Sequence, residues 1–437
     1  MERCVFLFLL FLPTFVSAQG NGERLASLKK LNEKYNIQRL VSADAAIVEK
    51  NELYGLVSLD GKTLLPAEYN IISETDGSSL LMLWKNGNAG FADRKGKIVI
   101  PVKYELGNII GNGPPIFSDG MTEVQLGEKY GVVDTTGRIV VPIKYDWFVY
   151  VDKNANVIIT YDYIEENLCI IMSLDGDTLL VADEYLDAYG DGLLAFKKNG
   201  LWGLYDTKNR KVIQHNYEDI RSDNGGLFSV KEKGRWRIID KNNKEKYSEA
   251  KRYIDDTSVF FPGKWNLIWG FKGSKFGAVD TKGNTIIPFR DHHIIDDNVR
   301  DRIVMMDDDN TTICVYDGKG NKIATYQSTY YDFEEDYGLE RMPFEVDGSF
   351  SLLDIKENKI LPFRYKEMNL VDGKHFAVKL DDGSKSLIDN EGNIIFKAPF
   401  EWIDYIGFGM YKFAVSTGPG HDDITVHFAD EKGNSTY

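Results

Sequence analysis

Short apolar runs of four to six residues, each bounded by turn-forming residues, recur along almost the whole chain. Two examples are 138–141, which follows Gly137, and 284–287, which follows Gly283. Runs of this length that are rich in Val and Ile and flanked by Gly, Asp or Pro are typical of β-strands. The pattern predicts an all-β protein built from many short strands.

The runs belong to one repeated phrase, aromatic-Gly-x-x-Asp-x-x-Gly-x-x-(V/I)-(I/L)-Pro-x-x-Tyr. Clear copies begin at Tyr130 and at Phe276. The second glycine of the phrase, or the residue that replaces it, falls at positions 61, 96, 137, 176, 209, 243, 283, 320, 357, 392 and 433. Eleven units with a period of about 37 residues indicate a repeat architecture.

The spacing of Asp and Gly within the phrase predicts a tight β-hairpin. An Asp, or Ser58 and Ser173 in two units, stands three residues before the anchor position and can cap the turn with its side chain. The anchor glycine accepts a positive φ, and Asn209 and Asn243 replace it in two units because Asn tolerates this conformation. With one more strand on each side of the hairpin, every unit becomes a four-stranded antiparallel meander.

A single meander cannot bury its own apolar face, so neighbouring units must pack against each other. The first repeat strand, near Ala45, and the incomplete last unit, which stops at Tyr437, could complement each other in a closed ring, as in β-propellers. One large ring, two smaller rings and an open β-solenoid are all compatible with the pattern. We therefore expect residues 43–437 to form an array of about eleven β-repeats in a propeller-like ring or an open β-solenoid.

The residues before the array carry two different patterns. Residues 1–18 have a short charged start, an apolar run of about a dozen residues and Ala18 at the expected cleavage site, which together indicate a secretory signal peptide. Leu25, Leu28, Tyr35 and Leu40 then fall at helical spacing over 22–40. We expect residues 19–42 to form a short helical cap on the first unit, with a partner-binding helix as the alternative.

Charge and hydropathy narrow the classes of partner. The net charge of −15 argues against nucleic acid, whose phosphates require clustered Lys and Arg. No segment after the signal peptide has the ~20 apolar residues of a membrane span. We expect an exported chain in the periplasm, at the cell surface or outside the cell. Cys169 and Cys314 lie four units apart and are expected to be unpaired unless a closed ring brings them together.

The phrase resembles the WG (or KWG) repeat of bacteria. Trp202-Gly203 followed by Asp206 is the best copy, and Tyr54-Gly55 and Phe276-Gly277 are aromatic variants. The resemblance extends over approximately residues 45–437. It implies an exported interaction module and brings no catalytic residues.

Residues with catalytic or metal-binding chemistry do not form a recognisable motif. The recurring Asp residues are explained by the turns, and the 307–310 loop and His421 with Asp422 are isolated candidates for a metal. The six His residues lack His-Glu-x-x-His spacing, and Cys-x-x-Cys is absent. We therefore predict no catalytic residues, no cofactor and no metal site.

Five tryptophans lie outside the aromatic-Gly position and are candidates for a ligand-stacking surface, with packing as the alternative. They are Trp84, Trp147, Trp265, Trp269 and Trp402. We expect a non-catalytic scaffold that binds a protein or an envelope polysaccharide. The alternative is a glycan-active enzyme with a carboxylate site on a propeller-like ring.

Overall fold

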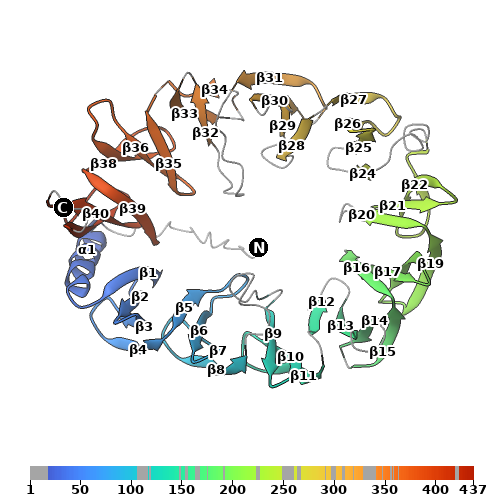
Figure 1. Cartoon of the computed structure of the whole chain (residues 1–437), viewed down its shortest axis with the longest axis horizontal. Coiled ribbons are helices and arrows are strands. Elements are labelled where there is room, and N and C mark those ends of the chain that lie inside the picture. The colour runs from blue at the N-terminus through green and yellow to red at the C-terminus, as the bar shows by residue number, and fades with distance from the viewer. Residues whose placement is uncertain are drawn as a thin grey trace, which may run out of the picture.

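The chain folds into a ring of small antiparallel β-sheets, seen along the axis of the ring in Figure 1. The computed structural model describes residues 18–105, 117, 120–146, 149–152, 156–162, 168–174, 176–189, 192–222, 227–248, 260–262, 267–290, 292–296, 302–307, 311–317, 319–327, 341–346, 348–354, 357, 359–362, 364–418 and 423–437. The expected signal peptide, apart from Ala18, lies outside these residues. The expectation of an all-β repeat protein with an N-terminal helix is confirmed.

The elements follow each other along the chain as one helix and a series of strands. The first third contains α1 (Ala18–Asn32), β1 (Asn36–Ser42), β2 (Ala45–Lys50), β3 (Leu53–Ser58), β4 (Thr63–Tyr69), β5 (Ile71–Glu74), β6 (Leu81–Lys85), β7 (Asn88–Ala92), β8 (Ile98–Glu105), β9 (Met121–Leu126), β10 (Lys129–Asp134) and β11 (Ile139–Tyr145). The middle contains β12 (Val149–Asp152), β13 (Val157–Asp162), β14 (Leu168–Ser173), β15 (Thr178–Ala182), β16 (Glu184–Tyr189), β17 (Leu193–Lys198), β18 (Leu201–Asp206), β19 (Lys211–Tyr217), β20 (Asp219–Ser222), β21 (Leu227–Glu232), β22 (Arg235–Asp240), β23 (Glu245–Lys246), β24 (Phe260–Pro262), β25 (Ile268–Lys272), β26 (Lys275–Val279) and β27 (Thr285–Arg290). The remainder contains β28 (His292–Asp296), β29 (Arg302–Asp307), β30 (Thr312–Asp317), β31 (Lys322–Gln327), β32 (Arg341–Val346), β33 (Ser349–Asp354), β34 (Lys359–Ile360), β35 (Glu367–Asp372), β36 (His375–Lys379), β37 (Lys385–Asp389), β38 (Ile394–Lys397), β39 (Phe400–Gly407), β40 (Met410–Ser416) and β41 (Ile424–Asp430).

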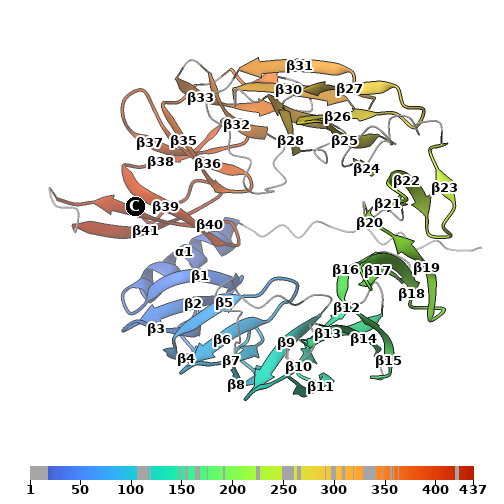
Figure 2. The same cartoon turned by 45° about the vertical axis from the view of Figure 1, so that its right-hand side comes forward.

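Each repeat unit is a meander of consecutive antiparallel strands, called a blade below. Most blades have four strands in chain order, such as β1–β4 and β16–β19. The seven-stranded sheet holds two blades, β5–β8 and β9–β11, which are joined by the single pairing of Glu105 with Gln125. The described residues thus contain eleven blades, and in Figures 1 and 2 the first strand of a blade lies inside the ring and the last outside.

The turn predicted by the Asp-x-x-Gly spacing is present. In the β10–β11 turn, Asp134 Oδ1 accepts hydrogen bonds from Thr136 N at 2.9 Å and from Arg138 N at 3.1 Å, and Gly137 has a φ of 84°. Asn243 also takes a positive φ, as expected. The β18–β19 turn differs from the expectation, because Arg210 rather than Asn209 has the positive φ.

The first glycine of the phrase is required by a bulge in the outer strand. Tyr130 pairs with Tyr145 and Val132 with Val141, so three residues of β11, beginning at Pro142, lie opposite Gly131 alone. The same bulge covers Gly90, where a Cβ atom would lie 2.6 Å from Ile100 O. Proline suits this bulge because it donates no hydrogen bond to the ladder.

The second glycine lies against the preceding blade. A Cβ atom on Gly96 would lie 2.7 Å from Leu64 O, and one on Gly137 would lie 2.6 Å from Val99 O. Leu64 and Val99 each stand three residues after the anchor glycine of their own unit. Gly433 makes the same contact with Ile395 O, whereas nothing lies within 4 Å of the Cβ position of Gly176. Where the contact is present, it sets how closely one blade packs on the next.

The hydrophobic core is divided into clusters between neighbouring blades. Leu204 and Tyr217 of the β16–β19 blade, for example, pack with Phe228 and Val230 of the β20–β23 blade. Eleven such clusters lie among the described residues, one for each junction around the ring. Burial between blades therefore supplies the stability that no blade has alone.

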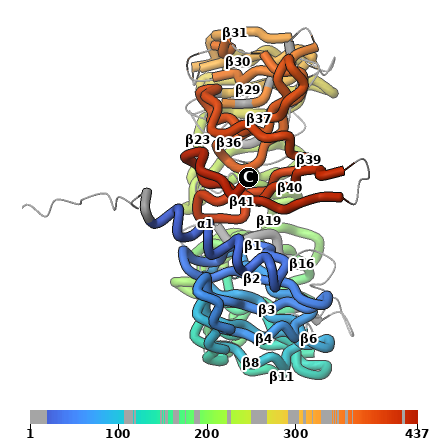
Figure 3. The backbone as a smooth tube through the Cα atoms, turned by 90° about the vertical axis from the view of Figure 1, so that its left-hand side faces the viewer, coloured from blue at the N-terminus to red at the C-terminus, as the bar shows by residue number. Residues whose placement is uncertain are grey.

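The ring closes by side-chain packing between the first and last blades. Leu25, Leu28 and Leu31 of α1 are buried with Ile406 and Phe428 of the last blade. Lys412 Nζ donates to Asn36 Oδ1 and to Ile37 O, both at 2.8 Å. Figure 3 shows α1 and β1 against β39–β41. The sequence suggested that strands from the two ends could complete each other's unit. Instead, β1 pairs with β2 in its own sheet, and β39–β41 form a separate sheet.

The helix is shorter than the expected 22–40 span and has a different role. It ends at Asn32, and 36–42 is the inner strand β1, in which Leu40 is buried. The helix contacts the last blade as well as the first, so it covers the junction that closes the ring. No helix in the described ranges is long and apolar enough to cross a membrane. Cys169 and Cys314 are buried and form no disulfide with each other.

The packing at the first glycine generates a stability prediction. Gly90→Ala places a methyl group against the backbone of the bulge, and we expect it to lower the free energy of unfolding by roughly 1–3 kcal/mol. Urea denaturation followed by circular dichroism measures the change. Gly22→Ala in α1 is the control, since nothing lies within 4 Å of its Cβ position. Equal denaturation midpoints for the two variants would show that the bulge tolerates a side chain.

A second prediction concerns Glu123, whose Oε2 accepts a 2.6 Å hydrogen bond from Val149 N of the next blade. Burial raises the pKa of Glu123 to about 7, although the bond from Val149 N opposes the shift. A raised pKa means that the folded protein favours the neutral acid. Glu123 therefore stabilises the fold fully below the ordinary pKa of 4.5, and this stabilisation is lost as the pH rises through about 7. Tyr130 and Glu105 are the other ionisable groups nearby.

Glu123→Gln keeps an acceptor for Val149 N and cannot ionise. We expect its free energy of unfolding to exceed that of the wild type by up to about 3 kcal/mol at pH 8 and to match it near pH 4.5. Denaturation across this pH range is the measurement, with the exposed Glu128→Gln as the control. A constant difference between wild type and Glu123→Gln at every pH would refute the titration of Glu123.

Candidate functional site

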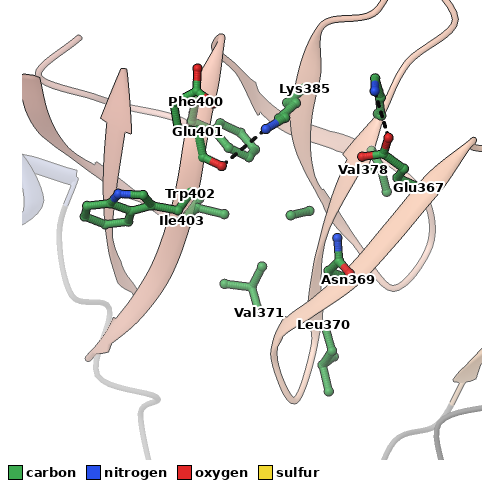
Figure 4. Close-up of a pocket in the computed structure, with 12 residues that line it drawn as sticks. Glu367, Asn369, Leu370, Val371, Val378, Lys385, Phe400, Glu401, Trp402 and Ile403 are labelled. Carbon is green, nitrogen blue, oxygen red and sulfur yellow. Dashed lines mark hydrogen bonds and ion pairs between the residues drawn. The ribbon is translucent and has the colours of Figure 1, made fainter. Parts of the chain in front are cut away.

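A pocket of about 220 Å³ lies between the β35–β38 blade and β39 of the last blade. Figure 4 shows Asn369 and Val371 on β35 facing Phe400 and Ile403 on β39 across it. The lining residues are Glu367, Asn369, Leu370, Val371, Ala377, Val378, Lys379, Lys385, Phe400, Glu401, Trp402 and Ile403. The walls are largely apolar, and lysine and glutamate residues stand at the rim.

The pocket lies where the repeat phrase is broken. Lys385-Ser386 precedes Asp389 at the spacing at which other units have aromatic-Gly before Asp. In six other units the aromatic side chain at this position packs into the junction with the next blade. These residues are Tyr54, Tyr130, Trp202, Trp236, Phe276 and Phe350. Four further units have Ala89, Cys169, Ile313 and Val426 at this position, and lysine stands in the corresponding junction here. A pocket lies beside Lys385, where those six units place an aromatic ring.

Two lysines at the rim are held differently. Lys379 Nζ pairs with Glu367 Oε1 at 2.7 Å, and this hydrogen bond holds the pKa of Glu367 below its ordinary value. Lys385 Nζ donates to the backbone oxygen of Glu401 at 3.2 Å and lies 5.9 Å from the centre of the Phe400 ring. Among the described residues no carboxylate lies within ion-pair distance of Lys385. The charge of Lys385 acts on Glu367 at longer range and helps to lower its pKa, but the ammonium group itself bonds only to a backbone oxygen and can still bind an anionic group in the pocket.

A polar cluster joins the two blades at the other end of β35. Tyr411 Oη on β40 donates to Asp372 Oδ2 at 2.9 Å, and His375 Nδ1 lies 2.9 Å from Asp372 Oδ1. Burial raises the pKa of Tyr411 and the neighbouring Asp372 adds to the effect, so Tyr411 stays protonated and acts as a donor. The cluster holds the two walls of the pocket together.

Trp402 is the sequence candidate that lies at the pocket. Its indole extends away from Val371 and Asn369 in Figure 4. Lys412 Nζ lies 5.7 Å from the centre of the ring, and it is the lysine that bonds to Asn36 and Ile37 across the closing junction. Burial lowers the pKa of Lys412, and the negative charges of Asp404 and Glu49 oppose this shift. The Trp402 ring thus belongs to the junction with the first blade, while its strand forms one wall of the pocket.

The other tryptophans do not join Trp402. Trp269 is 3% exposed and stacks on Phe276 with ring centres 5.4 Å apart, so it is a core residue rather than an accessible platform. Trp84 is half-buried on β6, far along the chain from this pocket. Trp147 and Trp265 lie outside the described residues. The tryptophans that the structure describes thus lie apart from one another, and ligand stacking by the partly exposed Trp84 and Trp402 stays a prediction.

The metal candidates lie mostly beyond the residues that the structure describes. Within the described part of the chain, no group of three or more His, Cys, Asp and Glu side chains is arranged to hold a metal ion. Residues 308–310, His421 and Asp422 lie outside that part.

Sequence reasoning missed Lys385, Phe400 and Lys379. The signal for Lys385 was present, since it is the only lysine at the aromatic position of the eleven units. Phe400 and Lys379 carry no such signal, because their place at the pocket depends on how two blades meet.

The fold defines the chain as a ring-forming β-repeat protein. A family model described as "WG containing repeat" matches residues 90–108, 130–149 and 202–236, each of which contains copies of the phrase. The chain is therefore a protein that contains WG repeats. A search of curated proteins found no match.

Several solved structures show a distant likeness. A eukaryotic initiation factor has 10% identity and a TM-score of 0.35, with 92% of this chain and 96% of that chain covered. BamB from Moraxella catarrhalis has 10% identity and a TM-score of 0.27, with 80% and 95% covered. PorZ, a surface component of the type-IX secretion system of Porphyromonas gingivalis, has 12% identity and a TM-score of 0.24, with 92% and 65% covered. These values are too low to carry an argument about function.

Proposed function

We propose that the chain is an exported, non-catalytic scaffold that binds a protein or an envelope polysaccharide in the pocket between the β35–β38 blade and β39. The observation that supports this function is the single lysine at the aromatic position, Lys385, which coincides with the pocket. A packing array has no need of a cation at a position that holds an aromatic or another uncharged side chain in the other ten units. Lys385 lies at the pocket between two blades, where a ligand can reach it.

The alternative is a glycan-active enzyme that uses the two carboxylates of the pocket, Glu367 and Glu401. A glycosidase needs one carboxylic acid with a raised pKa to protonate the leaving group. The ion pair with Lys379 lowers the pKa of Glu367 instead. This pocket therefore favours binding over hydrolysis.

Affinity capture tests the binding role. The mature chain, residues 19–437, is immobilised and exposed to an envelope extract of its own cells, in parallel with Lys385→Tyr. This variant restores the aromatic residue of the phrase and should fold at least as well as the wild type, because tyrosine occupies the same position in other blades. We expect the wild type to retain a stoichiometric partner and Lys385→Tyr to retain at least about tenfold less.

The captured material distinguishes the two kinds of partner. Protein in the eluate identifies a protein partner, and carbohydrate without protein identifies a polysaccharide. A hydrolysis assay then shows whether that polysaccharide is only bound or is also cleaved. Equal capture by the wild type and Lys385→Tyr would place the binding site elsewhere. Circular dichroism and the denaturation midpoint of Lys385→Tyr show that the fold is retained.

Export is the second element of the proposal and rests on the first 18 residues alone. We expect the intact mass of the chain isolated from the periplasmic, surface or extracellular fraction to correspond to a start at Gln19. A chain that retains Met1 and stays in the cytoplasmic fraction would refute export.

A further inference from the structure

The ligand class of the pocket follows from the way in which Lys385 breaks the repeat, and this inference rests on the proposed binding function. We infer that the pocket binds a carboxylate carried beside an apolar side chain, as at the free C-terminus of a peptide.

The space in the pocket is apolar and limited. Its walls include Val371 and Ala377 from one blade and Phe400 and Ile403 from the next, all of which also contact the buried cluster at this junction. The cavity of about 220 Å³ replaces an aromatic ring that other units insert between blades. A single apolar side chain can fill this space and bury its surface as the missing ring would.

The charge in the pocket is positive at one point. Lys379 is neutralised by Glu367 at 2.7 Å, and Lys397 on the same blade is neutralised by Asp382 at 2.7 Å. Lys385 bonds only to a backbone oxygen, which leaves two of its three ammonium donors for a ligand. The partly enclosed surroundings of Phe400 strengthen an ion pair relative to open water.

One lysine suits a carboxylate better than a more highly charged anion. Phosphate groups are usually held by several cations or by the fork of an arginine. Here the second lysine is already paired, and the exposed Glu401 at the rim repels additional negative charge. A carboxylate with a single charge, attached to an apolar group, matches both the cation and the walls.

Calorimetric titration of the mature chain with N-acetyl-leucine and with its uncharged amide tests this inference. We expect the wild type to bind the acid at least about tenfold more tightly than the amide. Lys385→Met should lose this preference, and Lys385→Tyr should lose binding of both compounds because the ring fills the cavity. Lys397→Met, which removes a neutralised lysine from the same blade, should retain the preference.

A short peptide that ends in leucine identifies the source of the carboxylate. Tighter binding of the free C-terminus than of N-acetyl-leucine supports a chain end, and equal affinity supports a free apolar acid. No binding, equal affinity of acid and amide, or an unchanged preference in Lys385→Met would overturn the inference. If the titrations give one of these results but Lys385→Tyr still fails to retain the captured partner, the proposed binding function is kept and only the proposed ligand class is rejected.

Discussion

The close approach of backbone to backbone at two glycines is the constraint on which the ring depends. Within a blade, the bulge of the outer strand passes over the first glycine, and a Cβ atom at Gly90 would lie 2.6 Å from Ile100 O. Between blades, the anchor glycine of one turn lies against the outer strand of the preceding blade, as Gly137 does against Val99. The first contact shapes the meanders that carry this glycine, and the second sets a similar packing distance at several junctions, as at Gly96, Gly137 and Gly433. The apolar clusters between blades form on this spacing, so the glycines position the core although they contribute no apolar surface to it.

Ring closure uses a different device from the repeats. The clusters between successive blades are built mainly from strand residues, whereas the junction of the last and first blades also buries three leucines of α1. Lys412 adds two hydrogen bonds across the same junction. A helix can serve here because its apolar face meets both end blades without having to match the hydrogen-bond register of either sheet.

The candidate site lies at a unit in which Lys385-Ser386 replaces the aromatic-Gly pair of the repeat phrase. A lysine cannot replace a buried aromatic ring by packing, because its ammonium group must keep polar contacts. Lys385 reaches the oxygen of Glu401 on the next blade and leaves the space beside it unfilled. The polar cluster of Asp372, His375 and Tyr411 holds the same two blades together at the other end of β35. The pocket thus combines walls from two linked blades with one cation that, among the described residues, has no carboxylate within ion-pair distance.

The sequence by itself determined the units, the turns and the all-β class, because these follow from contacts between residues close together in the chain. Asp134 caps its turn and Gly137 takes a positive φ for reasons that positions 134–138 already contain. The break in the phrase at Lys385 was also visible in the sequence, although its meaning was not. Only the tertiary structure decided that the ring closes, that Trp269 is a core residue and that Phe400 faces Lys385. These features depend on which blades meet, and that arrangement is set by contacts between residues far apart in the chain, which a local pattern does not encode.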